Sequence, residues 1–230
     1  MFSPFGTDGA IAPKEVNQSK MSELINSLLQ REAEAISTIP INNGYEAAVE
    51  ILYERIHCNH GKLVTSGMGK AGQIALNIST TFSSTGTPAI FLHPSEAQHG
   101  DLGVLQPNDV LLLISNSGKT REILELIDLA ENLYPNLPLI VITSDDKSQL
   151  ALTADVVLPT GNPKELCPLG LTPSTSTTVM TVIGDVLVNL MMRRIEFTSE
   201  EYAKRHHGGY LGHKSRRLSI GMEQLAKEKS

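Results

Sequence analysis

The spacing of apolar residues changes along the chain at about Gly61. Before that position, apolar residues recur at near-helical spacing in two stretches, which predicts helices over about residues 19–38 and 45–57. Pro40 and an Asn-Gly pair at 43–44 separate these two helices. After Gly61, short apolar runs alternate with helical patterns, and this alternation indicates repeated strand–helix units.

Five short apolar runs predict the strands of a sheet. They cover residues 62–66, 88–92, 109–115, 137–143 and 154–158. Helical patterns at 71–83 and 120–133 lie between them, and a long helix with one apolar face begins at Ser174. Strands that are apolar on both faces and joined by helices form parallel sheets covered on both sides. The sequence therefore predicts an α/β fold, which binds ligands beyond the carboxyl ends of its strands.

Composition narrows the class of protein. The chain has 230 residues, of which 40% are hydrophobic and 19% charged, as expected for one globular domain. It has no Trp, 4% aromatic residues and a net charge of −6, so we expect no nucleic-acid partner. Cys58 and Cys167 give no disulfide framework or metal spacing, which fits a reducing cytoplasm. The sequence carries no export signal and no run of 18 apolar residues, so we expect a cytoplasmic protein without a membrane span.

The loop after the third predicted strand has the features of a phosphate site. The apolar run 110–114 ends in Ser115-Asn116-Ser117-Gly118-Lys119-Thr120, and a helical pattern follows at once. Free N–H groups and the helix dipole favour an anion at such a helix start, and the hydroxyls can donate further hydrogen bonds. The same residue types also form ordinary turns and N-caps, so this loop alone leaves both interpretations open.

The turn after the first predicted strand reads Ser66-Gly67-Met68-Gly69-Lys70-Ala71-Gly72 and contains G-x-G-x-x-G. This pattern between a strand and a helix is the dinucleotide fingerprint. The second strand, however, ends in Leu92-His93-Pro94 without the acidic residue that binds ribose, which disfavours a nicotinamide cofactor. Alternatively, the glycines serve only to let helix and strand pack closely, but this leaves Lys70 unexplained.

A second hydroxyl-rich helix start, Ser174 to Thr178, follows a proline-rich loop at 159–173. Loops of this kind often line a site. N-capping after Pro173 accounts for one of the five hydroxyl residues. Two such helix starts in one open sheet predict a polar ligand held from two sides, with a phosphate at one of them.

Four residues are candidates for acid–base chemistry, namely His99, Glu122, Glu165 and His206. Each also has an ordinary interpretation, such as the favourable dipole interaction of Glu122 in a first helical turn. The string His57-Cys58-Asn59-His60 has metal-binding residue types, but it lies away from the expected ligand edge. We therefore expect no metal.

Six strings in one order carry a resemblance to a known family. They are SGMGKAG at 66–72, STGTPAIFLHPSEAQHGDLG at 84–103, ISNSGKTRE at 114–122, ELCPLGLTPSTSTT at 165–178, GDVLVNLMM at 184–192 and YAKRHHGGYLG at 202–212. With these strings the chain resembles the sugar isomerase (SIS) domain of arabinose 5-phosphate isomerases, from about residue 21 to residue 217.

The resemblance implies a three-layer α/β/α sandwich with a five-stranded parallel sheet, like a flavodoxin. We expect a flexible arm at 1–18, the SIS domain at 19–217 and a tail at 218–230. The implied reaction interconverts D-ribulose 5-phosphate and D-arabinose 5-phosphate through an enediol, for synthesis of the Kdo sugar of lipopolysaccharide or capsule. No metal or redox cofactor is implied.

The resemblance also assigns roles to residues. It implies catalytic roles for Lys70, His99, Glu122, Glu165 and His206. It implies substrate-binding roles for Ser66, Gly67, Met68, Gly69, Ser115, Asn116, Ser117, Thr120, Ser174, Thr175 and Ser176. We expect Lys70 to stabilise an enediolate oxygen and either Glu165 or His206 to act as the base at carbon. The family forms dimers and tetramers in which this histidine enters a neighbour's site, so a homotetramer with shared sites is expected.

Three departures from the family pattern matter. Many members carry two CBS domains after the SIS domain, and since this sequence ends at Ser230 we expect a single-domain form, with CMP-Kdo as a hypothetical feedback inhibitor at the active site. The usual S-Y-S-G turn reads SNSG at 115–118, followed by Lys119-Thr120 in place of Gly-Ala, which leaves the exact sugar open. The H-P-A-G-A-L-G motif reads HHGGYLG at 206–212, which retains the histidine but changes the stiffness of the loop.

Two alternatives therefore stand beside the leading hypothesis. One is an SIS isomerase for another sugar phosphate, such as a heptose or hexulose phosphate. The other is a sugar-phosphate-sensing module without turnover, as SIS domains form in some regulators. The filled acid–base positions and the absence of a helical arm with a basic face disfavour the sensor.

Overall fold

The computed structural model describes residues 18–227 and is built around a five-stranded sheet. Its order is β2-β1-β3-β4-β5, and every neighbouring pair is parallel. The strands are β1 (Leu63–Gly67), β2 (Ala89–Phe91), β3 (Val110–Ile114), β4 (Leu139–Thr143) and β5 (Val156–Pro159). Each overlaps a predicted apolar run, so the predicted parallel α/β sheet is confirmed.

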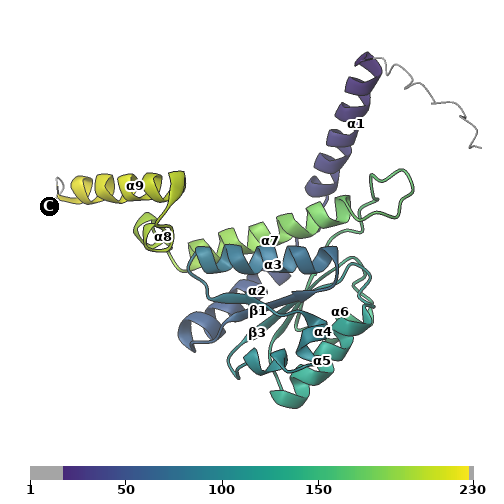
Figure 1. The fold of residues 1–230 in the computed structure, drawn as a ribbon, viewed down its shortest axis with the longest axis horizontal. Helices are drawn as coiled ribbons and strands as arrows, with labels where there is room; N and C mark the ends of the chain where they lie inside the picture. The colour runs from purple at the N-terminus through teal and green to yellow at the C-terminus, as the bar shows by residue number, and fades with distance from the viewer. Residues whose placement is uncertain (1–17, 228–230) are drawn as a thin grey trace, which may run out of the picture.

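Helices cover both faces of the sheet and make three layers (Figure 1). The helices are α1 (Gln18–Ser37), α2 (Gly44–Leu52), α3 (Lys70–Ser84), α4 (Pro94–Ala97), α5 (Arg121–Leu133), α6 (Gln149–Thr153), α7 (Thr175–Arg194), α8 (Ser199–Arg205) and α9 (Gly209–Lys227). Helices α2, α3 and α7 pack on one face, and α4, α5 and α6 pack on the other. This is the sandwich that the family resemblance implied.

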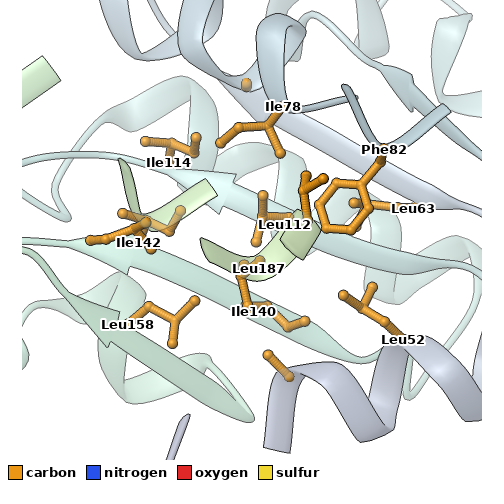
Figure 2. Packing of buried hydrophobic residues seen from close by; sticks show 14 of the residues in the cluster. Leu52, Leu63, Ile78, Phe82, Leu112, Ile114, Ile140, Ile142, Leu158 and Leu187 are labelled. Atoms are coloured by element: carbon orange, nitrogen blue, oxygen red, sulfur yellow. The ribbon is translucent and has the colours of Figure 1, made fainter. Parts of the chain in front are cut away.

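Alternate residues along the strands pack into one or the other of the two hydrophobic cores on either side of the sheet. Leu63, Leu112 and Ile140 point toward α2, α3 and α7, where they meet Phe82 and Leu187 (Figure 2). The intervening strand residues join the core beneath α4 and α5. Because both faces are covered, every residue of β1, β3 and β4 is buried. This explains why β3 and the first four residues of β4 are continuous apolar runs in the sequence, whereas β1 ends in Thr65, Ser66 and Gly67.

A buried carboxylate ties the amino ends of the two central strands together. Asp109, whose exposed fraction is 1%, accepts hydrogen bonds from the backbone N–H of Lys62 at 2.9 Å and from that of Gln106 at 2.8 Å. The Lys62 ammonium pairs with the same carboxylate at 2.6 Å. Charge and hydrogen-bond partners are therefore supplied together, as a buried carboxylate requires.

The order of the strands determines where a ligand can bind. From β1 the chain passes outward to β2 and returns on the other side as β3, so the strand order reverses between β1 and β3. Gly67 and Ile114, the last residues of these strands, are partners in the sheet register. The two turns singled out in the sequence therefore begin side by side at one edge of the sheet.

Two groups of helices extend beyond the sandwich (Figure 1). None of the described residues of α1 is buried, and α1 reaches out near the start of α7. Helices α8 and α9 pack on each other beyond the other end of α7. The predicted flexible arm lies outside the described residues except for Gln18, which belongs to α1, and the predicted tail from 218 begins inside α9.

Several elements differ from the sequence-based prediction. The second N-terminal helix is α-helical only to Leu52 and continues as a π-helix at Tyr53–Cys58. The short helices α4 and α6, a 3₁₀ turn at Asp101–Val104, and α8 and α9 were not predicted. By length and composition alone α7 would suffice to cross a membrane, but half of its apolar window is buried and it forms part of the core.

The first turn of α3 packs unusually closely on β1. A Cβ placed on Gly72 would lie 2.6 Å from the carbonyl oxygen of Gly67, and one on Gly67 would lie 2.8 Å from the backbone of Ala71. Backbone atoms in this position have no alternative rotamer that relieves the contact. The interpretation of the G-x-G-x-x-G pattern as a close-packing device thus has a geometric basis.

We expect Gly72→Ala to lower the free energy of unfolding by about 1–2 kcal/mol, because overpacking costs more than the roughly 1 kcal/mol that alanine contributes to a helix. Chemical denaturation would measure this change. Gly103→Ala is the matched control, since a Cβ there meets nothing within 4 Å. Equal stability of the two variants would show that α3 can move away from β1 without cost.

Candidate active site

The turn after β1 places Lys70 at the first position of α3. Gly69 precedes it as the N-cap with φ of 58°, and it provides no side-chain cap. Lys70 itself is exposed, whereas Ser66 is fully buried and its hydroxyl donates a hydrogen bond to the carbonyl oxygen of Leu92 at 2.6 Å. Lys70 is therefore free to meet a ligand, while the Ser66 side chain joins β1 to the end of β2.

A cavity of about 450 Å³ lies between α3 and α7 and includes the Lys70 side chain. Six of the eight residues that line it carry polar side chains; the full set is Lys70, Gln73, Ile74, Asn77, Thr177, Thr178, Thr181 and Val182. Lys70 and Thr177 both belong to the first turn of their helices. The cavity therefore connects the start of α3 with the start of α7.

The loop after β3 leaves the start of α5 open to an anion. Thr120 is the N-cap of α5 but makes no side-chain cap bond; its Oγ1 lies 2.8 Å from Oγ of Ser115 instead. In the first turn of α5 the N–H groups of Ile123 and Leu124 donate to the carbonyl oxygen of Thr120, whereas those of Arg121 and Glu122 precede any acceptor in the helix, as at any helix start. Asn116 and Ser117 are exposed at the tip of this loop. An open helix start beside exposed polar side chains suits an anion. The phosphate site at this loop stays a prediction.

Gly118 gives this loop its shape. Its φ of +63° favours glycine, and a Cβ there would lie 2.0 Å from Oγ of Ser148. Its carbonyl oxygen accepts a hydrogen bond from the N–H of Leu150, at the start of α6. The loop between β3 and α5 is thereby held against the loop that follows β4.

Glu165 caps the N-terminus of α7 from within the proline-rich loop. Its Oε2 accepts hydrogen bonds from the N–H of Ser174 at 2.7 Å, the N–H of Thr175 at 2.8 Å and the hydroxyl of Ser174 at 3.2 Å. Partial burial raises the pKa of Glu165, but hydrogen bonds from Ser176, Ser174 and Thr175 outweigh it, and the pKa is lowered from its usual value. Glu165 is thus ionised at neutral pH.

The hydroxyls at the start of α7 are largely engaged within the protein. Thr175 is 1% exposed, and its Oγ1 donates to Oε1 of Glu32 on α1 at 2.9 Å and accepts from the N–H of Leu166 at 3.2 Å. Ser176 is also buried, and its hydroxyl bonds to Glu165. The Glu165 carboxylate accepts hydrogen bonds from the N–H groups of Ser174 and Thr175 at this helix start. Substrate binding by Ser174, Thr175 and Ser176 stays a prediction.

The remaining predicted acid–base residues lie in two places. Glu122 is in the first turn of α5. His99 is exposed after α4, next to Gln98, whose side-chain amide donates to Oε2 of Glu125 at 2.7 Å. His99 therefore lies beside α5, on the same side of the sheet as Glu122.

His206 lies apart from these residues in the same chain. It follows α8, with its ring stacked on Tyr202 at 3.7 Å between centroids and its Nδ1 3.0 Å from the Tyr202 carbonyl oxygen. Helix α7 has 20 residues and separates this region from Ser174. A helix of that length spans about 30 Å. One chain thus brings Lys70, Glu122, Glu165 and the Ser115–Thr120 loop to one edge, with His206 at the opposite end.

Two side chains were not singled out as site candidates by the sequence analysis. Glu32 contacts Thr175 across 143 positions of sequence, and no local pattern signals such a contact. Cys167 was considered only for disulfides and metals, but hydrogen bonds from the Thr172 hydroxyl and from the N–H groups of Thr172, Leu171 and Leu169 lower its pKa to about 6. Cys167 lies two residues after Glu165, and this proximity is the feature of the sequence that could have marked it as a site candidate.

The site residues suit acid–base chemistry on a small anion. An open helix start, an exposed ammonium and an ionised carboxylate lie along one sheet edge. Among residues 18–227, no group of three or more His, Cys, Asp or Glu side chains is arranged to hold a metal ion. The His57–His60 string is separate from this edge, and His57 Nε2 lies 3.1 Å from Oγ1 of Thr87.

Curated proteins of known sequence are similar to most of this chain. Arabinose 5-phosphate isomerase KdsD of Yersinia pestis is 44% identical over 189 residues, which are 81% of this chain and 56% of that protein. The KdsD of Escherichia coli K12 is 45% identical over 186 residues, 81% of this chain and 55% of that protein. The chain thus spans about half the length of the curated relatives it matches.

Solved structures extend the comparison to the fold. A Bacteroides fragilis protein described as a phosphosugar isomerase involved in capsule formation is 67% identical, with a TM-score of 0.82, over 83% of this chain and 99% of that one. An E. coli CFT073 protein in complex with arabinose 5-phosphate is 34% identical, with a TM-score of 0.77, over 83% of this chain and 100% of that one. The family model described as the SIS domain matches residues 55–190. The chain belongs to the SIS domain family.

Proposed function

We propose that this chain is a sugar-phosphate isomerase that interconverts D-ribulose 5-phosphate and D-arabinose 5-phosphate. The observation that carries the proposal is the juxtaposition, at one sheet edge, of the open start of α5, the ammonium of Lys70 and the ionised carboxylate of Glu165. Relatives named arabinose 5-phosphate isomerase and a related structure in complex with arabinose 5-phosphate support this choice of sugar.

The phosphate of the substrate binds at the start of α5. The N–H groups of Arg121 and Glu122 and the exposed hydroxyl of Ser117 are the proposed donors to it, and the helix dipole favours the negative charge. The opposite helix start, at α7, already holds the Glu165 carboxylate. The two ends of the sugar are thereby distinguished, with the phosphate toward α5 and the carbonyl end toward α7.

Isomerisation moves a proton between two neighbouring carbons. A base removes the proton next to the carbonyl group, which leaves an enediolate, and a proton is then returned to the other carbon. Glu165 is the candidate base within this chain, and His206 of another copy is the alternative. The Lys70 ammonium stabilises the negative charge on the enediolate oxygen. Glu122 and His99, on the α5 side, are candidates for moving protons between the sugar oxygens.

The active form is proposed to be a homotetramer in the cytoplasm. His206 lies at the end of the domain opposite to Glu165, which supports sites shared between copies. The product is proposed to enter Kdo synthesis for lipopolysaccharide or capsule, and the capsule is favoured by the description of the Bacteroides fragilis relative. CMP-Kdo is retained as a proposed inhibitor because its phosphate group would compete for the start of α5.

A panel of pentose, hexose and heptose phosphates in heavy water, followed by proton NMR, tests the proposal. We expect turnover of D-ribulose 5-phosphate with deuterium entering the product at the carbon that gains a proton. Preferred turnover of a heptose or hexulose phosphate would favour the alternative SIS isomerase. Binding without any turnover would favour the sensing module and refute the proposed function.

We expect Glu165→Gln to lower kcat by about 10²–10⁴-fold, the usual contribution of a general base. The KM should change little, because the phosphate binds at α5. Glu131→Gln, at an exposed position in the same protein, is the matched control. A wild-type rate in Glu165→Gln would exclude Glu165 as the base and leave His206.

We expect Ser117→Ala to raise the KM about tenfold with little change in kcat. A hydrogen bond to a phosphate is made equally in the ground state and the transition state, so its loss weakens binding only. Steady-state kinetics would measure both constants. Thr153→Ala removes an exposed hydroxyl at the end of α6 and is the control. An unchanged KM in Ser117→Ala would place the phosphate elsewhere.

A further inference from the structure

Helix α1 contributes one side chain to the catalytic edge of the domain. None of the described residues of α1 is buried, yet Glu32 reaches the start of α7 and accepts a hydrogen bond from Oγ1 of Thr175 at 2.9 Å. The other oxygen, Oε2, is buried without a hydrogen-bond partner among the described residues. A half-satisfied carboxylate is costly for the fold, and such a residue calls for a reason other than stability.

Thr175 links Glu32 to the catalytic candidate Glu165. The backbone N–H of Thr175 donates to Oε2 of Glu165 at 2.8 Å, and its hydroxyl oxygen accepts from the N–H of Leu166, the residue after Glu165, at 3.2 Å. Thr175 therefore holds both the carboxylate and the backbone of this segment. It is 1% exposed, so water does not compete for these bonds.

The direction of the Thr175 hydroxyl depends on Glu32. A hydroxyl has a single hydrogen to donate, and it can accept from Leu166 only if that hydrogen points away. Glu32 Oε1 takes this hydrogen. Without an acceptor at this position the hydroxyl is free to rotate, and the bond that fixes the N–H of Leu166 is weakened.

We propose that Glu32 is a positioning residue for Glu165, acting through Thr175. Glu32 holds the Thr175 hydroxyl in the orientation that fixes residues 165–166, and the carboxylate of Glu165 is thereby held toward the bound sugar. The inference rests on the proposed function, because it assigns Glu32 a role in that reaction. Misplacing a reacting group by about 1 Å can cost about 10²-fold in rate.

The test compares Glu32→Ala and Glu32→Gln with Glu34→Ala, an exposed glutamate of the same helix. For Glu32→Ala we expect kcat to fall about tenfold or more and the KM to stay within about twofold, since the phosphate binds at α5. Glu32→Gln retains an acceptor oxygen, so its kcat should return to within about threefold of wild type. Glu34→Ala should match the wild type.

Amide hydrogen exchange provides a second readout that does not depend on turnover. Peptides that cover residues 163–176 should exchange faster in Glu32→Ala than in the other two variants, while peptides from the sheet remain unchanged. Thermal unfolding of all variants shows whether the domain stays folded.

The outcomes separate this inference from the proposed function. A Glu32→Ala variant that matches Glu34→Ala in kcat overturns the positioning role, even where exchange is faster. A fall in kcat in Glu32→Gln equal to that in Glu32→Ala also overturns it, because an acceptor oxygen is then not what matters. A wild-type chain that turns over no sugar phosphate refutes the proposed function, and unchanged exchange in Glu32→Ala then refutes the link through Thr175 as well.

Discussion

The parallel pairing of β1 with β3 is the constraint on which the site depends. The Asp109 carboxylate, with both Lys62 and Gln106 as partners, fixes the two strands at their amino ends. The register then sets Gly67 opposite Ile114 at their carboxyl ends. Each of these strands is followed by a short turn and a helix. Lys70 and the loop that begins at Ser115 therefore lie at the same edge of the sheet. A shift of this register by one residue would move every apolar side chain of β3 to the wrong core.

Of the helix starts at α5 and α7, only that of α5 is left open for an external anion. At α7 the protein supplies its own carboxylate, Glu165, and three hydrogen bonds to Oε2 satisfy the groups that a phosphate would otherwise contact. At α5 the cap residue Thr120 turns its hydroxyl to Ser115 and leaves the helix start open. A doubly charged ligand and a nearby carboxylate repel each other, so separate helix starts keep both charges stable.

The sequence was sufficient to predict those strands and helices that are long enough for their pattern of apolar residues to be recognised. The strand β3 and the first four residues of β4 are continuous apolar runs, and α3, α5 and α7 each contain several helical turns. The helices α4 and α6 have 4 and 5 residues, too few for a period to show. The positions of the loop at 115–120 and of Lys70 at the sheet edge could be predicted, because each closely follows a strand in the sequence. The partners of Ser66 and Thr175 could not, because Leu92 and Glu32 come close only after the sheet and α1 are in place.

The length of α7 bears on how the site is completed. Ser174 begins this helix of 20 residues, and His206 follows its far end, so about 30 Å of helix separates the histidine from Glu165. No rotation of a side chain covers that distance. Exposed apolar residues lie on α1 and α9, among them Leu24, Leu29 and Leu211, which are 54%, 63% and 54% exposed. Both regions project from the sandwich, at opposite ends of α7 (Figure 1). If His206 takes part in the reaction, it therefore does so in the site of a second copy, and association then becomes a condition for catalysis.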